Sequence, residues 1–337
     1  MAGLLVTAVI PTLAADPVLE ECLRSLAAQT FQHLEVIVVD NSGKGLARQW
    51  SASFPGVRVL ENPSNAGFGA AVNQGFWASE APYLATLNDD VNAWPDWLEA
   101  LVKAAESNPD AGMFASQIRL AGRHMLDSAG MVICPDGSSK QRGHLRPPEE
   151  FSSAEEVLLP SACAALYRRQ MLEAIGGFDE DFFLYSEDTD LGLRARWAGW
   201  KCLYVPGAVV EHRYSHSAGR ASPLKAYYVE RNRLFLIMKN FPAGCLALAP
   251  LFTLERYGWH LVSIVRGRGL GAEFCNQGGS IFRLLWIVIK AHFAMIWNWP
   301  ALIQKRSAVR QTARLSPAQF RQLLRTYGIS TKEVAAL

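Results

Sequence analysis

Short apolar runs separated by amphipathic stretches characterise the first 110 residues of the chain. A short apolar run bounded by polar residues predicts a buried strand, and apolar residues at helical spacing predict a helix. Strands are predicted at residues 5–10, 34–39, 57–60 and 83–87. Helices are predicted from about Pro17, at 69–78 and at 95–107. This alternation of strand and helix indicates an α/β fold with a mostly parallel sheet.

The pattern changes after residue 110, where shorter elements are expected. Short strands are predicted at 113–118, 131–134, 202–205 and 209–210, and helices at 169–175 and 186–197. Residues 135–157 are rich in Gly, Pro, Ser and charged side chains, which predicts a mobile loop. After residue 224 the strand pattern stops. Helices are predicted there at 224–240, 246–265 and 281–299, followed by a basic segment at 305–327.

Charge divides the chain in a way that the net charge of +2 conceals. Residues 1–224 carry 17 Lys and Arg against 27 Asp and Glu, whereas residues 225–337 carry 16 against 4. The C-terminal part therefore has an excess of 12 positive charges, which favours an anionic partner such as lipid or nucleic acid. The six cysteines show no Cys-x-x-Cys spacing, so no zinc site or redox motif is indicated. A reducing compartment is expected.

The predicted C-terminal helices combine apolar and charged residues. The helix at 246–265 contains Arg256 near its middle, and the helix at 281–299 contains Arg283 and Lys290. A central Arg or Lys disfavours a membrane span by roughly 2.5–3.5 kcal/mol. Trp, Phe and Leu mixed with basic residues favour helices that lie in the membrane interface. The alternative is a helical subdomain that packs on the rest of the protein.

Two adjacent carboxylates, Asp89 and Asp90, follow the predicted strand at 83–87. The carboxyl ends of strands are where open α/β sheets bind ligands. Two buried like charges require a proton or a cation, and Mg²⁺ is typically bound by carboxylates together with phosphate oxygens. The segment therefore predicts a divalent metal that holds a diphosphate, with a solvated turn as the alternative. Farther along, His212 and His216 are candidate metal ligands, although a lone histidine is more often structural.

Two further segments carry candidate groups for binding a nucleotide. Asp40 ends the strand at 34–39, where it can accept a hydrogen bond from a nucleobase or a ribose hydroxyl. The alternative is a turn-capping role. Asn65-Ala66-Gly67-Phe68-Gly69 lies between a strand and a helix, so its backbone N–H groups can approach a phosphate. The same Gly-x-Gly invites a dinucleotide-binding interpretation, but the third glycine of that fingerprint is absent.

Three carboxylates crowd the start of the helix predicted at 186–197, namely Glu187, Asp188 and Asp190. The helix dipole favours anions at this position by about 0.3–1 kcal/mol. That effect accounts for one or two of the three carboxylates. The surplus predicts a general base that removes a proton from a hydroxyl group.

With these residues, the chain resembles the family-2 glycosyltransferases of the GT-A fold, and within them the bacterial rhamnosyltransferase-like branch. The matching segments run in family order across residues 5–240. They are Val9-Ile10-Pro11-Thr12, Val38-Val39-Asp40-Asn41-Ser42, Asn65-x-Gly67, Asn73-x-Gly75, Leu87-Asn88-Asp89-Asp90-Val91, Gly176-Gly177-Phe178-Asp179, Glu187-Asp188-x-Asp190-Leu191, His212 and Arg231-Asn232-Arg233.

The resemblance implies the GT-A fold of nucleotide-diphospho-sugar transferases, which has a mixed, mostly parallel sheet flanked by helices. Residues 1–110 would form its nucleotide-sugar-binding half, and residues 111–223 its acceptor-binding and catalytic half. Residues 224–337 would form a basic, amphipathic helical region that associates with a membrane.

The resemblance also implies a role for each matching residue. Asp188 would be the catalytic base, and Asp90 and His212 would be ligands of Mg²⁺ or Mn²⁺. The residues that would bind the nucleotide sugar are Pro11, Thr12, Asp40, Asn65, Gly67, Asn73, Asn88, Asp89, Glu187 and Asp190. The first Asp of the family's Asp-x-Asp motif is Asn88 here, which implies a modest metal affinity.

The implied activity is that of an inverting, metal-dependent glycosyltransferase in cell-envelope polysaccharide synthesis. Its donor would be a nucleoside-diphosphate sugar, with dTDP-rhamnose favoured, and its acceptor a hydroxyl of a lipid-linked glycan or another envelope saccharide. It would act at an anionic membrane surface, as a peripheral protein on the cytoplasmic face of the plasma membrane. A homo-oligomer is possible, and no nucleic-acid partner is expected. Two alternatives remain open: a non-catalytic, membrane-bound partner subunit and a nucleotide-dependent oxidoreductase.

Overall fold

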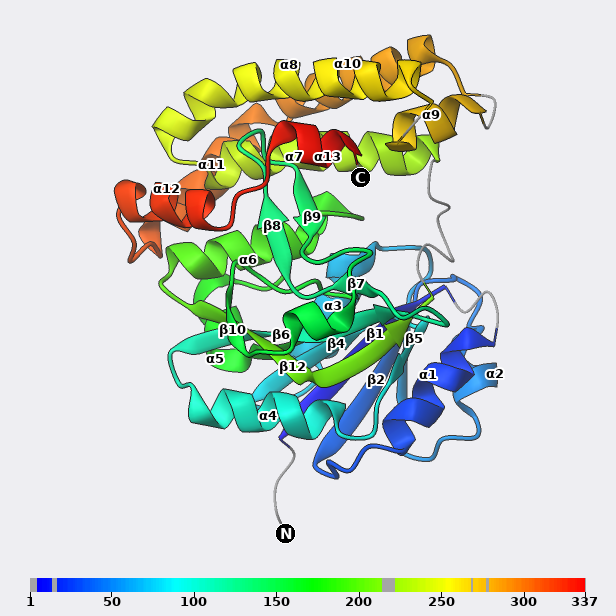
Figure 1. Cartoon of the computed structure of the whole chain (residues 1–337). Coiled ribbons are helices and arrows are strands. Elements are labelled where there is room, and N and C mark those ends of the chain that lie inside the picture. Colours follow the sequence, from blue (N-terminus) through cyan, green and yellow to red (C-terminus); the bar gives the residue numbers. More distant parts are fainter. Residues whose placement is uncertain (1–4, 14–16, 214–221, 268, 277–278, 337) are drawn as a thin grey trace. The chain divides into compact units, whose positions relative to one another are not determined.

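The computed structural model describes residues 5–13, 17–213, 222–267, 269–276 and 279–336 (Figure 1). Contacts between residues divide the chain into two compact units. Unit 1 comprises residues 1–131, 141–195 and 200–214, and unit 2 comprises residues 132–140, 196–199 and 215–337. Unit 1 contains a large mixed sheet, whereas unit 2 is mainly helical.

The sheet of unit 1 contains the predicted strands together with several shorter ones. Its strands are β1 (Val6–Thr12), β2 (Leu34–Asp40), β3 (Arg58–Glu61), β4 (Tyr83–Leu87), β5 (Val91–Ala93), β6 (Ala111–Leu120), β7 (Leu126–Ser128), β10 (Glu155–Val157), β11 (Ala164–Arg168) and β12 (Lys201–His212). Their order is β10-β12-β6-β11-β4-β1-β2-β3, with β5 beside β12 and β7 beside β6. β3, β2, β1, β4, β6 and β12 run in one direction, and β11 runs antiparallel between β4 and β6. The mostly parallel sheet predicted from the sequence is confirmed.

Helices cover both faces of this sheet. They are α1 (Val18–Ala27), α2 (Ala47–Ser51), α3 (Phe68–Trp77), α4 (Trp97–Ser107), α5 (Arg169–Ile175) and α6 (Glu187–Trp197), with 3-10 turns η1 (Pro148–Phe151) and η2 (Glu180–Phe182). One apolar cluster joins Ile10 of β1 to Leu23 of α1 and Trp97 of α4. A second cluster joins Val9 of β1 to Phe76 of α3. Because successive side chains of a strand point to opposite faces, a strand covered on both faces reads as a continuous apolar run.

Unit 2 combines a hairpin with long helices. The hairpin strands are β8 (Met131–Ile133) and β9 (Ser139–Gln141), and the helices are α7 (Pro223–Asn240), α8 (Ala243–Val265), α9 (Gly269–Asn276), α10 (Ile281–Trp297), α11 (Trp299–Gln311), α12 (Pro317–Thr326) and α13 (Thr331–Ala336). α7 begins where the Ser222 hydroxyl accepts a hydrogen bond from the Lys225 N–H, with Pro223 in the first turn. Both features favour a helix start at this point. α7 packs against α8, α10 and α11.

The segment predicted as a mobile loop at 135–157 has more structure than its composition suggested. It contains β9, η1 and β10, and it buries Phe151 and Val157. These two anchors are isolated in the sequence and give no periodic pattern, so the prediction of a loop was wrong for this part. The two strands predicted at 202–205 and 209–210 form one strand, β12, with a register irregularity between them.

The helix predicted at 281–299 is α10, which ends two residues earlier, at Trp297, and is followed by α11 from Trp299. Pro300 lies in the first turn of α11, a position that accommodates proline because it needs no backbone N–H donor. In the described part of the chain, no single helix is both long and apolar enough for a membrane span. α10 and α11 reach that length and hydropathy only as a pair, with a 67° bend between them.

Gly75 of α3 lies where the helix comes close to β1. A Cβ atom at this position would be 2.5 Å from Cγ1 of Val9, so no side chain fits without movement. We expect Gly75→Ala to lower the free energy of unfolding by about 1–3 kcal/mol, as overpacking of a core does. The change should appear in calorimetry as a lower Tm.

Gly258 of α8 provides the matched control, because a Cβ atom there meets nothing within 4 Å in the described chain. Gly258→Ala should leave Tm unchanged or raise it, since alanine is favoured over glycine inside a helix by about 0.8–1.0 kcal/mol. A Gly75→Ala protein as stable as the wild type would contradict the close packing of α3 on β1.

Candidate active site

The ends of parallel strands bring several predicted site residues to one edge of the sheet. β1 ends at Thr12, β2 at Asp40 and β12 at His212, and β4 leads directly into Asn88-Asp89-Asp90. These four strands run in the same direction. Their carboxyl ends therefore form the edge at which open α/β sheets bind ligands.

The turn formed by Asn88, Asp89 and Asp90 is held by contacts with two neighbouring strands. Thr12 follows Pro11 at the end of β1, and its Oγ1 donates a hydrogen bond of 2.6 Å to Oδ2 of Asp89. The N–H of Asn88 donates to the carbonyl of Cys163 at 2.9 Å. The carboxylate of Asp89 is thus turned toward β1, whereas the carboxylate of Asp90 faces His212.

His212 lies between two carboxylates. Its Nε2 is 3.3 Å from Oδ1 of Asp90, and its Nδ1 is 2.7 Å from Oδ2 of Asp127. Burial disfavours the imidazolium, but Cys163 and the two carboxylates together raise the pKa of His212 well above its usual range. The contact with Asp127 fixes the orientation of the ring so that Nε2 is directed at Asp90. The other candidate, His216, lies outside the described residues.

Asp90 and His212 would supply two side-chain ligands for the predicted Mg²⁺ or Mn²⁺. Within the described residues, no group of three or more His, Cys, Asp and Glu side chains could hold a metal. The pair still fits an ion that takes its remaining ligands from phosphate and water, as Mg²⁺ usually does. The carboxylate behind His212 supports this fit, because metal-binding histidines almost always donate their second ring N–H to such a group.

Asp188 lies in the first turn of α6, and the segment before β11 connects it to the metal-ligand pair. Oδ2 of Asp188 accepts a hydrogen bond from the Ala162 N–H at 3.2 Å, and Oδ1 accepts one from the Thr189 N–H at 2.6 Å. The next residue, Cys163, holds the Asn88 N–H and contributes to the pKa shift of His212. The predicted base and the predicted metal ligands therefore meet at one short segment, residues 162–163.

Glu187 and Asp188 form a pair of neighbouring acids with different surroundings. Glu187 is 8% exposed, and its Oε2 has no hydrogen-bond partner among the described residues. Burial and the adjacent charge of Asp188 raise the pKa of Glu187 to about 8. Burial also raises the pKa of Asp188, against hydrogen bonds that lower it. The hydrogen bonds to Asp188 favour its ionised form, whereas Glu187 lacks such bonds and holds its proton up to a pKa of about 8.

Asp190 has a structural partner. Its Oδ2 accepts a hydrogen bond of 2.8 Å from Nε of Arg194, one turn along α6. The same guanidinium donates to the carbonyls of Ile175, Gly176 and Gly177. Asp190 thus orients an arginine that anchors the chain after α5.

The backbone before α6 adopts an unusual conformation. Phe183, Tyr185 and Ser186 have φ values of 61°, 69° and 65°, and such left-handed residues cost of order 1–3 kcal/mol each. The carbonyl of Phe183 accepts a hydrogen bond from Phe68 N–H at 2.9 Å. A Cβ atom at Gly67 would lie 2.4 Å from that carbonyl oxygen. The loop from Asn65, whose Oδ1 accepts the Gly67 N–H, is therefore pressed against the segment that precedes the base.

Two residues predicted to contact the nucleotide also hold the chain itself. Nδ2 of Asn73 donates to the Phe178 carbonyl at 2.9 Å, and its Oδ1 accepts the Phe178 N–H at 2.8 Å. Asp40 is fully buried and accepts the N–H groups of Ser42 and Ala47. Both side chains therefore stabilise loops through these hydrogen bonds. Their contact with a nucleotide stays a prediction.

Sequence reasoning missed Asp127 and the segment at Ala162 and Cys163. Asp127 is 3% exposed and lies in β7, between Leu126 and Ser128. A carboxylate inside a short buried strand was a usable signal, because an ionised group is rarely buried without a partner. The role of residues 162–163 comes from their backbone atoms, for which no side-chain pattern exists.

This fold and arrangement of carboxylates are those expected of a nucleotide-sugar transferase, and the comparison with protein families supports that class. The model of "Glycosyl transferase family 2" matches residues 7–176, and that of "Glycosyl transferase family group 2" matches residues 152–303. The chain belongs to glycosyl transferase family 2 and is a glycosyltransferase. The oxidoreductase alternative is thereby set aside.

Two curated relatives are rhamnosyltransferases. The chain is 34% identical to the N-acetylglucosaminyl-diphospho-decaprenol L-rhamnosyltransferase of Mycobacterium tuberculosis, over 66% of this chain and 82% of that protein. It is 27% identical to a rhamnosyltransferase of Escherichia coli, over 62% of this chain and 87% of the relative. The resemblance to the rhamnosyltransferase-like branch is confirmed.

Solved structures confirm the GT-A fold. A mannosyltransferase of Pyrobaculum calidifontis, in complex with GDP-Man and Mn²⁺, has a TM-score of 0.52 at 18% identity, over 98% of this chain and 85% of that one. GalNAc-T7 with UDP, GalNAc and Mn²⁺ has a TM-score of 0.59 at 14% identity, over 89% of this chain and 58% of that one. At these identities the likeness concerns the fold alone.

The proton on Glu187 should make stability depend on pH. In the folded chain its pKa is about 8, whereas an unfolded chain loses this proton near pH 4.5, so stability falls as the pH rises between these values. We expect Glu187→Gln to be more stable than the wild type by about 1–3 kcal/mol at pH 8.5. The difference should narrow toward pH 5, as measured by urea unfolding of metal-free protein.

Glu106→Gln serves as the control, because Glu106 is exposed on α4. Its free energy of unfolding should follow that of the wild type at each pH. A constant difference between Glu187→Gln and the wild type across this range would mean that Glu187 is ionised in the folded chain.

Proposed function

We propose that this glycosyltransferase moves rhamnose from a nucleoside-diphosphate donor, dTDP-rhamnose in the first instance, to a hydroxyl of a lipid-linked glycan. Transfer inverts the anomeric carbon and uses Mg²⁺ or Mn²⁺. The names of both curated relatives support the sugar, and the diphospho-decaprenol in one name supports a lipid-linked acceptor. The Mn²⁺ in the two solved structures supports the divalent metal.

The proposal extends to where the reaction takes place. A lipid-linked acceptor resides in a membrane, and the C-terminal excess of positive charge favours an anionic surface. We therefore place the protein on the cytoplasmic face of the plasma membrane, as a peripheral enzyme of cell-envelope polysaccharide synthesis.

One observation carries the reaction: residues 162–163 contact both the base and the metal-ligand turn. The Ala162 N–H binds the carboxylate of Asp188, and the Cys163 carbonyl binds the N–H of Asn88. A donor diphosphate at Asp90 and His212 would therefore lie beside a base that is partly exposed. An inverting transfer requires this proximity, because one group stabilises the leaving diphosphate while another activates the acceptor.

The chemistry assigns one task to each element of the site. When bound, the divalent metal would neutralise negative charge that grows on the departing nucleoside diphosphate. Asp188 accepts the proton of the acceptor hydroxyl while the hydroxyl oxygen forms its bond to the anomeric carbon. The bond to the diphosphate oxygen breaks in the same displacement, which inverts that carbon. Thr12 holds Asp89 in place, and His212 is held by Asp127.

The base role predicts a separation of binding from chemistry. Asp188→Asn should lower the rate of transfer by about 10²–10⁴-fold, the usual contribution of a general base. Binding of dTDP with Mn²⁺, measured by calorimetry, should persist because Asp90 and His212 are untouched. Transfer from dTDP-rhamnose is followed by mass spectrometry, and NMR of the product reports the anomeric configuration.

Asp110→Asn is the control, since Asp110 is exposed and pairs with Lys201. It should transfer at the wild-type rate. Equal loss of dTDP binding and transfer in Asp188→Asn would contradict the assignment of the base, and a product of retained configuration would contradict the single displacement.

Asp127 should control metal affinity although it is not a ligand. Asp127→Asn weakens the hold on Nδ1 of His212, so we expect Mn²⁺ to bind about 10–100-fold more weakly, as for other carboxylates behind metal-bound histidines. Electron paramagnetic resonance of free Mn²⁺ measures the affinity in the presence of dTDP. Asp136→Asn removes a buried carboxylate of unit 2 and should lower stability without this effect. Unchanged Mn²⁺ affinity in Asp127→Asn would exclude His212 as a ligand oriented by Asp127.

A further inference from the structure

The long helix α8 turns its apolar face outward. Its buried side chains are Ala249, Thr253 and Arg256. Its exposed large hydrophobic side chains are Leu248, Leu251, Leu254, Leu261, Val262 and Val265. At helical periodicity the two sets lie on opposite faces. α8 therefore buries a guanidinium and exposes a row of leucines and valines, which is the reverse of a helix that faces water.

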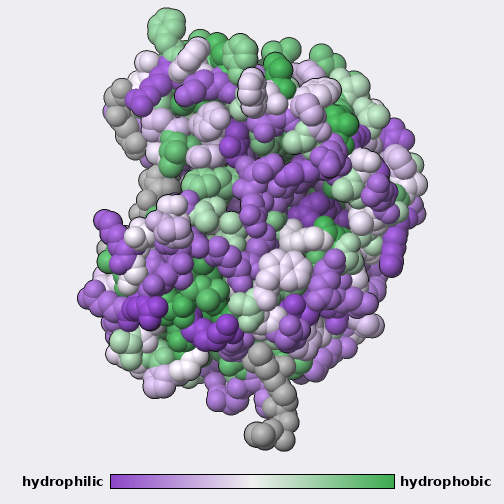
Figure 2. Space-filling view, turned by 180° about the vertical axis from the view of Figure 1, so that it is seen from behind, coloured by the Kyte–Doolittle hydropathy of each residue, from purple (hydrophilic) through white to green (hydrophobic). Residues whose placement is uncertain are grey.

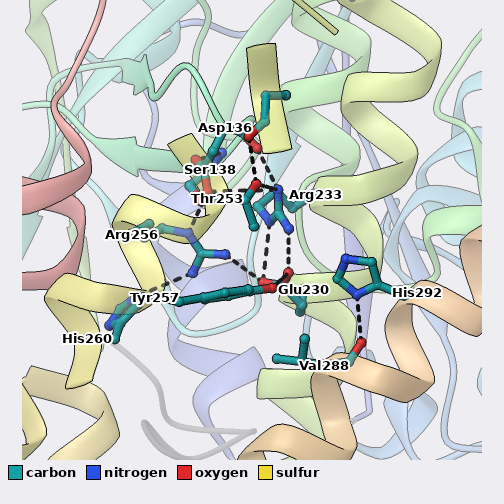
Figure 3. Close-up of polar contacts among 11 residues, drawn as sticks. Asp136, Ser138, Glu230, Arg233, Thr253, Arg256, Tyr257, His260, Val288 and His292 are labelled. Atoms are coloured by element: carbon teal, nitrogen blue, oxygen red, sulfur yellow. Dashed lines mark hydrogen bonds and ion pairs between the residues drawn. The ribbon is translucent and has the colours of Figure 1, made fainter. Parts of the chain in front are cut away.

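Arg256 is accommodated inside unit 2 because it belongs to a cluster of paired charges (Figure 3). Its Nε lies 2.5 Å from Oδ2 of Asp136, and its Nη2 lies 2.8 Å from Oε2 of Glu230. Arg233 of α7 also donates to Glu230 and, at 2.7 Å, to the carbonyl of Asp136. Tyr257 donates to Glu230 at 2.5 Å. Two carboxylates therefore face two guanidinium groups, and the opposite charges of these four side chains balance.

α10 also exposes an apolar face, although its buried side chains are apolar as well. Ile287 and Ala291 are its buried residues. Its exposed large hydrophobic side chains are Ile281, Phe282, Leu285, Trp286, Ile289, Phe293, Ile296 and Trp297. Two of them protrude strongly, Phe282 at 83% and Trp297 at 87% exposure. Their exposure shows that no described segment of the chain covers this face.

The two helices that carry these apolar faces both belong to unit 2. Both helices pack against α7, and Figure 1 shows α8 and α10 on one side of it. Figure 2 shows hydrophobic side chains, in green, among the hydrophilic surface of this unit. Soluble proteins rarely expose apolar side chains in such rows, and larger exposed patches mark contact with another protein or with a membrane.

We infer that the outward faces of α8 and α10 dock together into the interface of an anionic membrane. The excess of 12 positive charges in residues 225–337 attracts acidic headgroups. Arg283 and Lys290 are exposed beside the apolar row of α10, where long basic side chains reach the headgroup level. Trp286 and Trp297 are residues that favour the membrane–water boundary. Glu255 is the exposed acidic residue of α8, next to the apolar row.

A second copy of this chain suits the same surface less well. Pairing through these faces would bring two strongly basic regions together, and like charges at an interface oppose association. A membrane with acidic lipid instead complements both features, the apolar rows and the positive charge beside them. The inference deepens the proposed peripheral location by naming the surface that meets the membrane, and it rests on the proposed function for the identity of that membrane.

The test measures co-sedimentation of the full-length protein with vesicles of phosphatidylcholine alone or mixed with phosphatidylglycerol. The wild type should bind the mixed vesicles more tightly. The double variant Trp286→Ser/Phe293→Ser should bind them at least about tenfold more weakly, because it removes two inserted aromatic side chains. Equal binding by the wild type and the double variant overturns the inference.

The single variants Trp286→Ser and Trp77→Ser form a matched pair. Trp286 is 58% exposed and Trp77, on α3 of unit 1, is 59% exposed. Trp77→Ser should bind vesicles as the wild type does, and Trp286→Ser more weakly; an equal effect of both overturns the inference. Analytical ultracentrifugation without vesicles detects self-association. If the wild type forms a dimer that the double variant disrupts, while vesicle binding is unchanged, the apolar face belongs to an interface with a second copy. That result also overturns the inference.

Failure of the docking inference can be told apart from failure of the proposed reaction. Asp188→Asn should bind vesicles as tightly as the wild type, because the base lies in unit 1. Vesicle binding that depends on Trp286 supports the inference even if no nucleotide sugar is transferred.

Discussion

The backbone of Ala162 and Cys163 is the contact on which the site depends. Two hydrogen bonds from adjacent residues hold the carboxylate of Asp188 and the N–H of Asn88. Asn88 and Asp188 are far apart in the sequence, and their own elements do not fix their separation. Because β11 pairs with both β4 and β6, the segment that precedes it is fixed by the sheet. The geometry of the predicted site is thus anchored to the strands β4, β11 and β6 of unit 1.

Buried charge is managed in three different ways within this chain. In unit 2, Glu230 and Asp136 are paired with arginines, and burial is offset by opposite charge. Around the metal-ligand pair, the carboxylate of Asp127 is balanced by an imidazole. Glu187 has no ion-pair partner among the described residues, and burial raises its pKa so that the side chain holds its proton up to a pKa of about 8. The first two arrangements hold structure, whereas the third places an uncharged acid next to the base.

The sequence predicted the sheet of unit 1 well, because its strands are short apolar runs with clear boundaries. β4 spans the predicted residues 83–87 without change. Family motifs placed Asp90, Asp188 and His212, since the resemblance carries three-dimensional information that no periodicity contains. Asp127 could not be predicted in the same way, because its contact with His212 depends on how β7 folds back on β6. For α8, the sequence showed that the helix carries charged residues but not which of its faces is buried. Only the structure shows that Arg256 points inward.

Gly67 and Phe183 share a backbone contact that leaves no room for a side chain. The loop predicted to meet the donor and the strained segment before Asp188 therefore cannot shift independently of one another. If a nucleotide binds at that loop as predicted, a displacement of the loop would also move the segment that leads into the first turn of α6. Such coupling favours an ordered sequence of binding, in which the donor settles the position of the base before the acceptor hydroxyl arrives.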